Sequence, residues 1–283
     1  MSKNTITIKG KEYEIKKELG KGGFGRVIQV LNKSDNKYYA IKEIEIIGDM
    51  KDIIKYFEAE ADFLSKFDCK NIVKYYNSYK DNYKFYIVME YCEGQTLRAL
   101  IDKNKKKNEL IEEDILYNII KQICLGIKEI HDKNIIHRDI KPENIFMNDN
   151  KDIKIGDFGI SKYFGPNKDY LVTLKKAGSV FYTAPEIITN GIYNEKADMY
   201  SLGCVIYELF HLSVYYNDKI GKTIKKIDKE IYNYKWQEII NSLLQPNYNQ
   251  RMSIDKVYNI ILNEIGINDL ENKINNMKIN GAD

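Results

Sequence analysis

The sequence predicts an α+β protein of two lobes, a small β-rich N-lobe that contains one helix and a larger α-helical C-lobe. Apolar and polar residues alternate through residues 12–47, as they do in half-buried strands. After residue 95, apolar residues recur at helical spacing over long segments. A chain of 283 residues is long enough for one two-lobed unit with a ligand-binding cleft between its lobes.

The N-lobe is expected to span about residues 12–89, after an N-terminal extension of residues 1–11. Strands are predicted at residues 12–19, 26–32, 38–47, 72–80 and 84–91. From Asp49 the spacing becomes helical, because one face would collect Ile53, Phe57, Ala61 and Leu64. Residues 90–94 are expected to form the hinge between the lobes.

The C-lobe is expected over residues 95–265, and a polar tail over residues 266–283. Helices are predicted at 97–103 and 112–133, the second with a buried stripe of Ile115, Ile119, Ile123, Ile127 and Ile130. Short hairpins are expected around HRDIKPEN and IKIGDFG, and helices from Glu186 to about Ile265. Polar residues interrupt the apolar segment 199–216, so it is predicted to be a buried helix and not a membrane span.

Charge and cysteine content narrow the possible partners. The net charge of +3, from 44 Lys and Arg against 41 Asp and Glu, gives no reason to expect nucleic acid or an anionic membrane. The lysine run KNKKK, residues 103–107, is expected to be a solvated loop. Cys69, Cys92, Cys124 and Cys204 lack metal-site spacing. No signal peptide is visible, so we expect a reducing compartment, the cytoplasm or else the nucleus.

The glycine cluster GKGGFGRV, residues 20–27, has the pattern GxGxxGxV and can hold phosphates. A dinucleotide fingerprint would need a helix after the glycines, whereas a strand is predicted here. A Walker A loop is excluded, because Arg26 follows the last glycine. We therefore expect a hairpin whose backbone closes over phosphates through Gly20, Gly22 and Gly25.

Two aspartates and an asparagine predict that a bound phosphoryl group is transferred to an acceptor. Asn144 of HRDIKPEN and Asp157 of IKIGDFG offer hard oxygen ligands of the kind that Mg²⁺ takes. Asp139 then remains to receive the proton of an acceptor hydroxyl. Lys42, on the strand after the hairpin, would hold phosphates, and Glu60 on the following helix would hold Lys42.

Five motifs in order, GKGGFGRV, AIK, HRDIKPEN, DFG and APE, resemble the protein kinase family over about residues 12–265. The resemblance implies the two-lobed kinase fold, with ATP and Mg²⁺ as cofactors. It implies that Asp139 is the catalytic base, that Asn144 and Asp157 are the metal ligands, and that Lys42 and Glu60 form an ion pair.

The same resemblance assigns the nucleotide pocket. It implies that the backbone of Glu90 and Cys92 binds adenine, that Met89 is the gatekeeper, and that the apolar sandwich is Val27, Ala40 and Phe146. It further implies a stack of side chains linking the lobes: Tyr75, Leu64, Phe158 and His137. His137 is thus expected to be packed and not to act as a base.

Lys141, two residues after the catalytic aspartate, resembles the lysine of serine/threonine kinases that steadies the transferred phosphoryl group. The expected reaction is transfer of the ATP γ-phosphate to Ser or Thr hydroxyls of proteins. The chain looks most like the never-in-mitosis-related kinases. Alternatives are a kinase of translation initiation factor two alpha, suggested by MEYC and Thr96-Leu97, or a pseudokinase scaffold that binds nucleotide without transfer.

Activation and support residues follow from the same resemblance. Arg138 would pair with a phosphate on the activation loop. The position that is usually phosphorylated is occupied by Lys175, so Thr173 is the expected substitute. Ser179 would contact the catalytic aspartate and lysine. Glu186 and Arg251 are expected to form a structural ion pair, while Arg26 and Arg98 receive no role.

Overall fold

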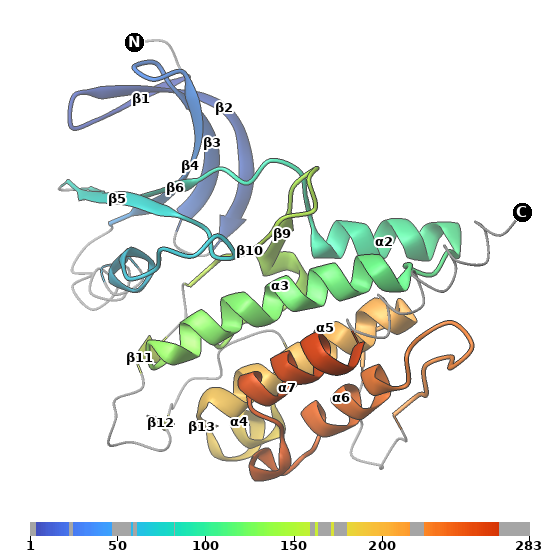
Figure 1. The fold of residues 1–283 in the computed structure, drawn as a ribbon. Coiled ribbons are helices and arrows are strands. Elements are labelled where there is room, and N and C mark those ends of the chain that lie inside the picture. The colour runs from blue at the N-terminus through green and yellow to red at the C-terminus, as the bar shows by residue number, and fades with distance from the viewer. Residues whose placement is uncertain are drawn as a thin grey trace, which may run out of the picture.

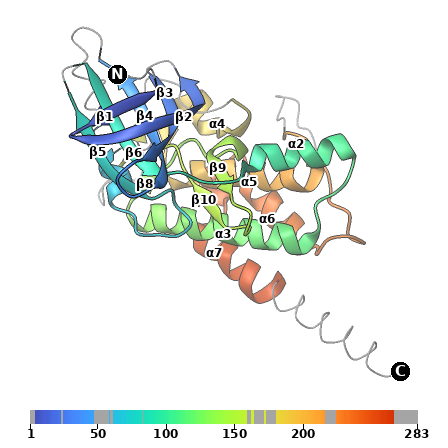
Figure 2. The same cartoon turned by 90° about the horizontal axis from the view of Figure 1, so that it is seen from above.

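The computed structural model describes residues 4–22, 25–46, 58, 61–81, 83–158, 162–163, 171–172, 180–215 and 224–265. A curled sheet forms the N-lobe and stands on a helical C-lobe (Figure 1). Figure 2 shows the same arrangement from above, with the sheet lying over part of the helical lobe. The predicted α+β fold of two lobes is confirmed.

The N-lobe sheet has six antiparallel strands in the order β1-β2-β3-β4-β6-β5. The strands are Thr5–Ile8 (β1), Lys11–Gly22 (β2), Gly25–Asn32 (β3), Lys37–Glu45 (β4), Tyr75–Lys80 (β5) and Lys84–Glu90 (β6). The predicted N-terminal extension therefore contributes an edge strand, because Thr5–Ile8 pairs with β2. One face is closed by the buried side chains of Ile8, Tyr13, Ile28, Val30, Ile41, Tyr86 and Val88.

The segment between β4 and β5 places a helix against the other face of the sheet. Residues 61–65 are helical, and Ala61 and Leu64 are buried as the predicted spacing requires. Ile53, Phe57 and the start of this helix lie outside the described residues. The strand expected at 72–80 begins only at Tyr75, because Ile72 instead bridges to Ile155 of the C-lobe.

The C-lobe helices are Leu97–Lys107 (α2), Glu113–Asp132 (α3), Pro185–Asn190 (α4), Glu195–His211 (α5), Lys235–Leu243 (α6) and Ile254–Ile260 (α7), which continues as a π-helical turn, Ile261–Ile265. The expectation that residues 103–107 form a loop is wrong, since they complete α2. Lysines in the last turn of a helix face its partial negative charge, and Asn108 ends α2 in the left-handed conformation.

Helices α3 and α5 form the centre of the C-lobe core. The predicted stripe on α3 is buried except at Ile115, which is only half-buried. All residues from Ala197 to Phe210 of α5 are buried, so the apolar segment is a core helix. A Cβ on Gly203 would lie 2.7 Å from the Cβ of Leu243, so this glycine lets α6 approach α5 closely. No helix in the described part of the chain is long and apolar enough to span a bilayer.

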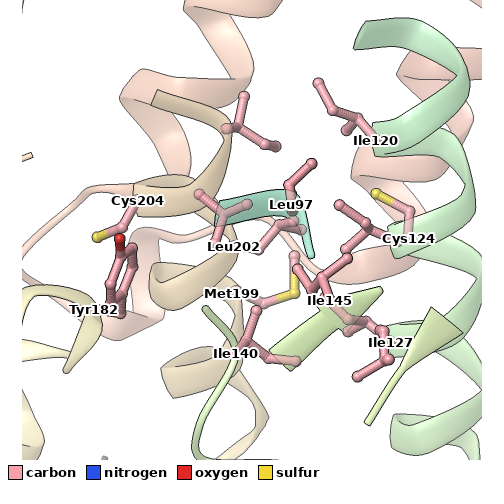
Figure 3. Close-up of a cluster of buried hydrophobic side chains, with 14 of the residues drawn as sticks. Leu97, Ile120, Cys124, Ile127, Ile140, Ile145, Tyr182, Met199, Leu202 and Cys204 are labelled. Atoms are coloured by element: carbon pink, nitrogen blue, oxygen red, sulfur yellow. The ribbon is translucent and has the colours of Figure 1, made fainter. Parts of the chain in front are cut away.

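The core extends to the hairpins that carry the sequence motifs. Figure 3 shows Leu97 of α2, Ile127 of α3 and Met199 of α5 converging on Ile145. Ile145 belongs to β9 (Ile145–Met147), which pairs with β10 (Ile153–Ile155) and with β7 (Gln95–Thr96). Shorter elements are β8 (Ile135–Ile136), β11 (Lys162–Tyr163), β12 (Leu171–Val172), β13 (Ile192–Tyr193) and the 3₁₀ turns Pro142–Asn144 (η1), Val180–Tyr182 (η2) and Tyr248–Gln250 (η3). The HRDIKPEN loop is therefore held between the buried strands β8 and β9, and the IKIGDF segment begins in the buried strand β10.

Candidate active site

The glycine cluster lies in the hairpin between β2 and β3, as expected for a loop that runs from strand to strand. Gly20 is opposite Val27, and Gly22 is opposite Gly25. A Cβ on Gly25 would lie 1.9 Å from the carbonyl oxygen of Glu43 on β4, so only glycine fits there. Gly23 and Phe24, at the tip, lie outside the described residues.

Lys42 lies on β4, between Val27 on β3 and Ile87 on β6. Its Nζ is 3.6 Å from Oδ1 of Asp157, so a cation of the N-lobe meets an acid of the C-lobe. Glu60, the expected partner of Lys42, lies outside the described residues. Glu58, the nearby alternative carboxylate, contacts Lys80 at 3.7 Å.

The residues assigned to adenine lie on strands of both lobes. Ala40 is opposite Met89 in the sheet, and Phe146 of β9 lies across from Thr96. A Cβ on Gly156 would lie 2.9 Å from both the Phe146 ring and Val73, so a glycine before Asp157 lets Phe146 pack there.

Ion pairing fixes the hinge at its N-lobe end. The Glu90 amide donates to the carbonyl of Lys74, and its carboxylate binds Lys154 at 3.0 Å. Burial raises the pKa of the nearby Cys92 thiol to about 12, and the Glu90 carboxylate adds to this effect, so the thiol is protonated at neutral pH. Cys92 therefore does not offer a reactive thiolate at the hinge.

Asp139 is held by two groups from its own loop. Lys141 Nζ donates to Oδ2 of Asp139 at 2.5 Å, and Nδ2 of Asn144 donates to the same oxygen at 2.9 Å. The carboxylate is thus oriented before any substrate arrives. An acceptor hydroxyl at Asp139 would also lie beside the Lys141 ammonium, which can neutralise the charge of a transferred phosphoryl group.

His137 is a packed residue, with no exposed surface. Its Nδ1 accepts from the Asp139 amide at 3.2 Å, so its Nε2 carries the proton and donates to the Gly156 carbonyl at 3.0 Å. The Phe158 ring lies edge-on to His137, with 4.7 Å between the ring centroids, and its centroid is 5.3 Å from that of Phe67. The histidine therefore ties Asp139 to the loop that carries Asp157, and both its ring nitrogens are used.

Asp198, at the start of α5, is a residue of the site that the sequence analysis missed. Its buried carboxylate accepts from the amides of His137 and Arg138, both at 2.8 Å, and contacts Nε2 of His131 at 3.0 Å. Burial alone would raise the pKa of Asp198, but His131 and the neighbouring donors lower it below its usual range. The anion holds Arg138 at φ +73°, a conformation that is strained for a bulky residue.

Asn144 and Asp157 form a set that fits a magnesium ion. The Asn144 amide nitrogen is used on Asp139, which leaves its side-chain oxygen as a ligand. The Gly156 amide donates to the Asn144 backbone carbonyl at 3.0 Å, so the residue before Asp157 is joined to Asn144, and the Asp157 side chain is half-exposed. Two hard oxygen donors suit Mg²⁺, which keeps several of its waters. The described residues contain no cluster of three His, Cys, Asp or Glu that would suggest another metal.

Comparison with known proteins assigns this arrangement to a family. The family model described as "Protein kinase domain" matches residues 13–261. The chain belongs to the protein kinase family. The match includes the glycine hairpin, the Asp139 loop and both predicted metal ligands.

Among the relatives of this kinase domain are serine/threonine-protein kinases named Nek. Nek3 of Mus musculus is 36% identical over 249 residues, which cover 85% of this chain and 47% of the relative. Nek5 of Homo sapiens is 40% identical over 199 residues, which cover 70% and 28%. This chain therefore spans less than half the length of either relative. The predicted resemblance to never-in-mitosis-related kinases is confirmed, and these relatives give no support to the translation-factor alternative.

The kinase domain contains the predicted ion pair between Glu186 and Arg251. Two parallel hydrogen bonds of 2.7 and 2.8 Å join the buried groups. The remaining donors of Arg251 are satisfied by the carbonyls of Lys196, Gln245 and Pro246. A buried pair with every donor used fixes α4 to the loop before α7.

The expectation that Arg26 and Arg98 have no special place in the kinase domain is wrong. Arg26 binds the buried carboxylate of Glu43, which also contacts Lys84. Arg98 binds Glu143 and Glu208 in the C-lobe. Arg26 and Glu43 lie opposite each other across the hairpin of β3 and β4. Sequence spacing gives no signal for the contacts of Arg98, because its partners lie 45 and 110 residues away along the chain.

The proposed switch residues of the kinase domain lie outside the described part of the structure. These are Thr173, Lys175 and Ser179. Arg138, the residue expected to receive a phosphate, is described and is held through its backbone by Asp198. The dependence of activity on Thr173 thus stays a prediction.

Proposed function

We propose that this chain transfers the γ-phosphate of ATP to serine or threonine hydroxyls of protein substrates. The observation that carries the proposal is the Asp139 carboxylate, oriented by Lys141 and Asn144, with Asn144 joined through its backbone to the residue before Asp157. Such a constellation places a proton acceptor, a cation and two metal ligands at one point of the cleft.

Each residue has a defined task in the proposed reaction. The glycine hairpin would bind the phosphates through its backbone, and Lys42, which lies near Asp157, would hold them with its ammonium group. Asn144 and Asp157 would hold Mg²⁺, which neutralises charge on the phosphates. Asp139 accepts the proton of the attacking hydroxyl, and Lys141 faces the negative charge on the transferred group.

The test compares the purified chain with Asp139→Asn on a library of peptides that carry Ser, Thr or Tyr acceptors. Wild type is expected to phosphorylate Ser and Thr, and the variant to lose on the order of 10²- to 10⁴-fold in kcat with ATP binding retained. Mass spectrometry identifies the acceptor residue. Equal transfer by both proteins would refute the role of Asp139, and ATP binding by an inactive wild type would support the pseudokinase alternative.

A further inference from the structure

The Glu43 cluster, which consists of Glu43, Arg26 and Lys84, lies in the N-lobe sheet at the base of the glycine hairpin. Glu43 of β4 has only 2% of its surface exposed. Its Oε2 accepts from Nε of Arg26 on β3 at 3.1 Å and lies 3.0 Å from Nη2 of the same guanidinium. Its Oε1 accepts from Nζ of Lys84 on β6. One carboxylate therefore joins three neighbouring strands, β3, β4 and β6 (Figure 1).

The cluster lies where the glycine hairpin returns to the sheet. Arg26 directly follows Gly25 and is opposite Glu43 in the register of β3 and β4. A Cβ on Gly25 would lie 1.9 Å from the carbonyl oxygen of Glu43, so the backbone of the hairpin packs against the backbone of Glu43. The side chain of Glu43 then binds the next residue along the hairpin. Glu43 thus fixes the base of the hairpin to β4 through both its backbone and its side chain.

The same strand carries Lys42, the cation that would hold the phosphates of a nucleotide. Successive side chains of a strand point to opposite faces of the sheet, so Glu43 points away from the face that carries Lys42. Lys42 faces the cleft, because its Nζ is 3.6 Å from Oδ1 of Asp157. The Glu43 cluster would therefore not touch a nucleotide bound beside Lys42. Its influence on that nucleotide would pass through the backbone of β3 and β4.

Stability alone does not account for a charge at this position. Burial would raise the pKa of Glu43, but hydrogen bonds from Lys84 and Arg26 lower it below its ordinary value, so the carboxylate is charged at neutral pH. Its neighbours on the same face, Ile28 and Ile41, are apolar and have no exposed surface. Replacement of a buried ion pair by packed apolar side chains is often neutral or stabilising. An apolar side chain would, however, lack the fixed geometry that a carboxylate imposes on two cations.

We propose that Arg26, Glu43 and Lys84 are positioning residues that fix the glycine hairpin relative to Lys42 and so determine how tightly the nucleotide phosphates bind. The inference rests on the proposed kinase function and deepens it, because it assigns the geometry of the phosphate site to side chains on the opposite face of the sheet. Arg26 should have the larger effect, since it directly follows the hairpin. Lys84 holds the carboxylate from β6 and should have a smaller one.

The experiment measures the Kd of a non-hydrolysable ATP analogue with Mg²⁺ by calorimetry, together with KM for ATP and for a peptide substrate. Arg26→Met is expected to raise the Kd and the KM for ATP about fivefold, and to leave the KM for the peptide within about twofold of wild type. Arg26→Lys, which keeps the cation, should stay within about twofold of wild type in all three quantities. The double variant Arg26→Met with Glu43→Gln should bind the analogue no more weakly than the weaker single variant, because both residues act through one contact.

Lys33→Met is the matched control. Lys33 binds Glu12 at 2.9 Å, and this exposed pair joins β2 and β3 at the ends that lie away from the hairpin. Its loss should leave the Kd of the analogue unchanged. The proposal is overturned if Arg26→Met keeps the Kd within about twofold of wild type, or if Lys33→Met weakens binding as much as Arg26→Met does. A lower melting temperature of Arg26→Met with an unchanged Kd would show that the cluster serves stability alone.

The two cations keep the test decisive if Glu43→Gln fails to fold. The side chains of Arg26 and Lys84 are 39% and 35% exposed, so either can be shortened without opening the core. An unchanged Kd in both Arg26→Met and Lys84→Met would overturn the proposal. If wild type binds the analogue but transfers no phosphate, the proposed function fails, and the Kd of Arg26→Met still decides the present inference.

Discussion

The two halves of the candidate site are held in different ways. In the C-lobe half, His137 and Asp198 are buried. Hydrogen bonds join His137 and Arg138 to Asp198 and Gly156, and another joins the Asp139 amide to the His137 ring. In the N-lobe half, Lys42 reaches across the cleft to Asp157 at 3.6 Å, and half of the Asp157 side chain is exposed. The C-lobe half is therefore assembled before ligand binds, whereas contacts to nucleotide would complete the N-lobe half.

This difference separates catalysis from stability. Exposed ion pairs contribute little to folding, because solvent screens them and their side chains lose entropy. A buried anion with several donors contributes to both stability and catalysis. Its loss leaves buried amides unpaired and a strained backbone without the hydrogen bonds that compensate for the strain. Substitutions in the two halves should thus have different signatures.

The largest effect is expected for Lys42→Met. Transfer should fall by about 10²- to 10³-fold, because a cation aimed at the phosphates is removed, while the melting temperature stays near that of wild type. Steady-state kinetics and thermal unfolding measure the two quantities. A lower melting temperature without loss of transfer would show that Lys42 serves stability and not catalysis.

Glu60→Ala sharpens the same comparison. The sequence predicts reduced transfer, because Lys42 would lose its partner. Glu58→Ala is the matched control, since the Glu58 carboxylate contacts Lys80 and not Lys42. Full activity of Glu60→Ala together with loss in Glu58→Ala would transfer the role to Glu58.

Asp198→Asn should damage the C-lobe half in both respects. An amide keeps the shape but turns one acceptor into a donor that faces an N–H group, so we expect a loss of about 3 kcal/mol in the free energy of unfolding and about tenfold in kcat. Urea unfolding and peptide kinetics provide the measurements. Asp255→Asn, an exposed carboxylate on Lys128, should change neither. A stable Asp198→Asn protein would contradict the buried-anion account.

The sequence predicts one kind of residue in this site and misses another. Asp139, Asn144 and Asp157 are predictable, because their residue types and their order along the chain indicate phosphoryl transfer before any distance is known. Asp198 is missed because it belongs to a helix with an apolar centre, where only its burial reveals its need for donors. The one available signal is the acid itself, which burial would make costly unless it is paired. Arg98 is missed for a different reason, because its partner Glu208 lies 110 residues away along the chain.

A smaller effect on the free energy of unfolding is expected when the pH is lowered. Burial lowers the pKa of His211, in the last turn of α5, to about 4, and Lys225 adds to this effect. The unfolded chain would therefore bind a proton below about pH 6.5 that the folded chain does not, so stability is lost as pH falls from 6.5 towards 4. We expect about 1 kcal/mol from this group, and His211→Gln should flatten that part of the stability curve. An unchanged curve would show that His211 titrates normally.

Hydrogen exchange tests most directly the claim that only the C-lobe half is assembled before ligand binds. The amides of His137 and Arg138, which donate to Asp198, should be protected in the free protein. Addition of a non-hydrolysable ATP analogue with Mg²⁺ should then increase protection in the hairpin of residues 20–27 and at the hinge, and leave residues 137–139 unchanged. Fast exchange at residues 137–139 in the free protein, followed by protection when nucleotide binds, would contradict the account.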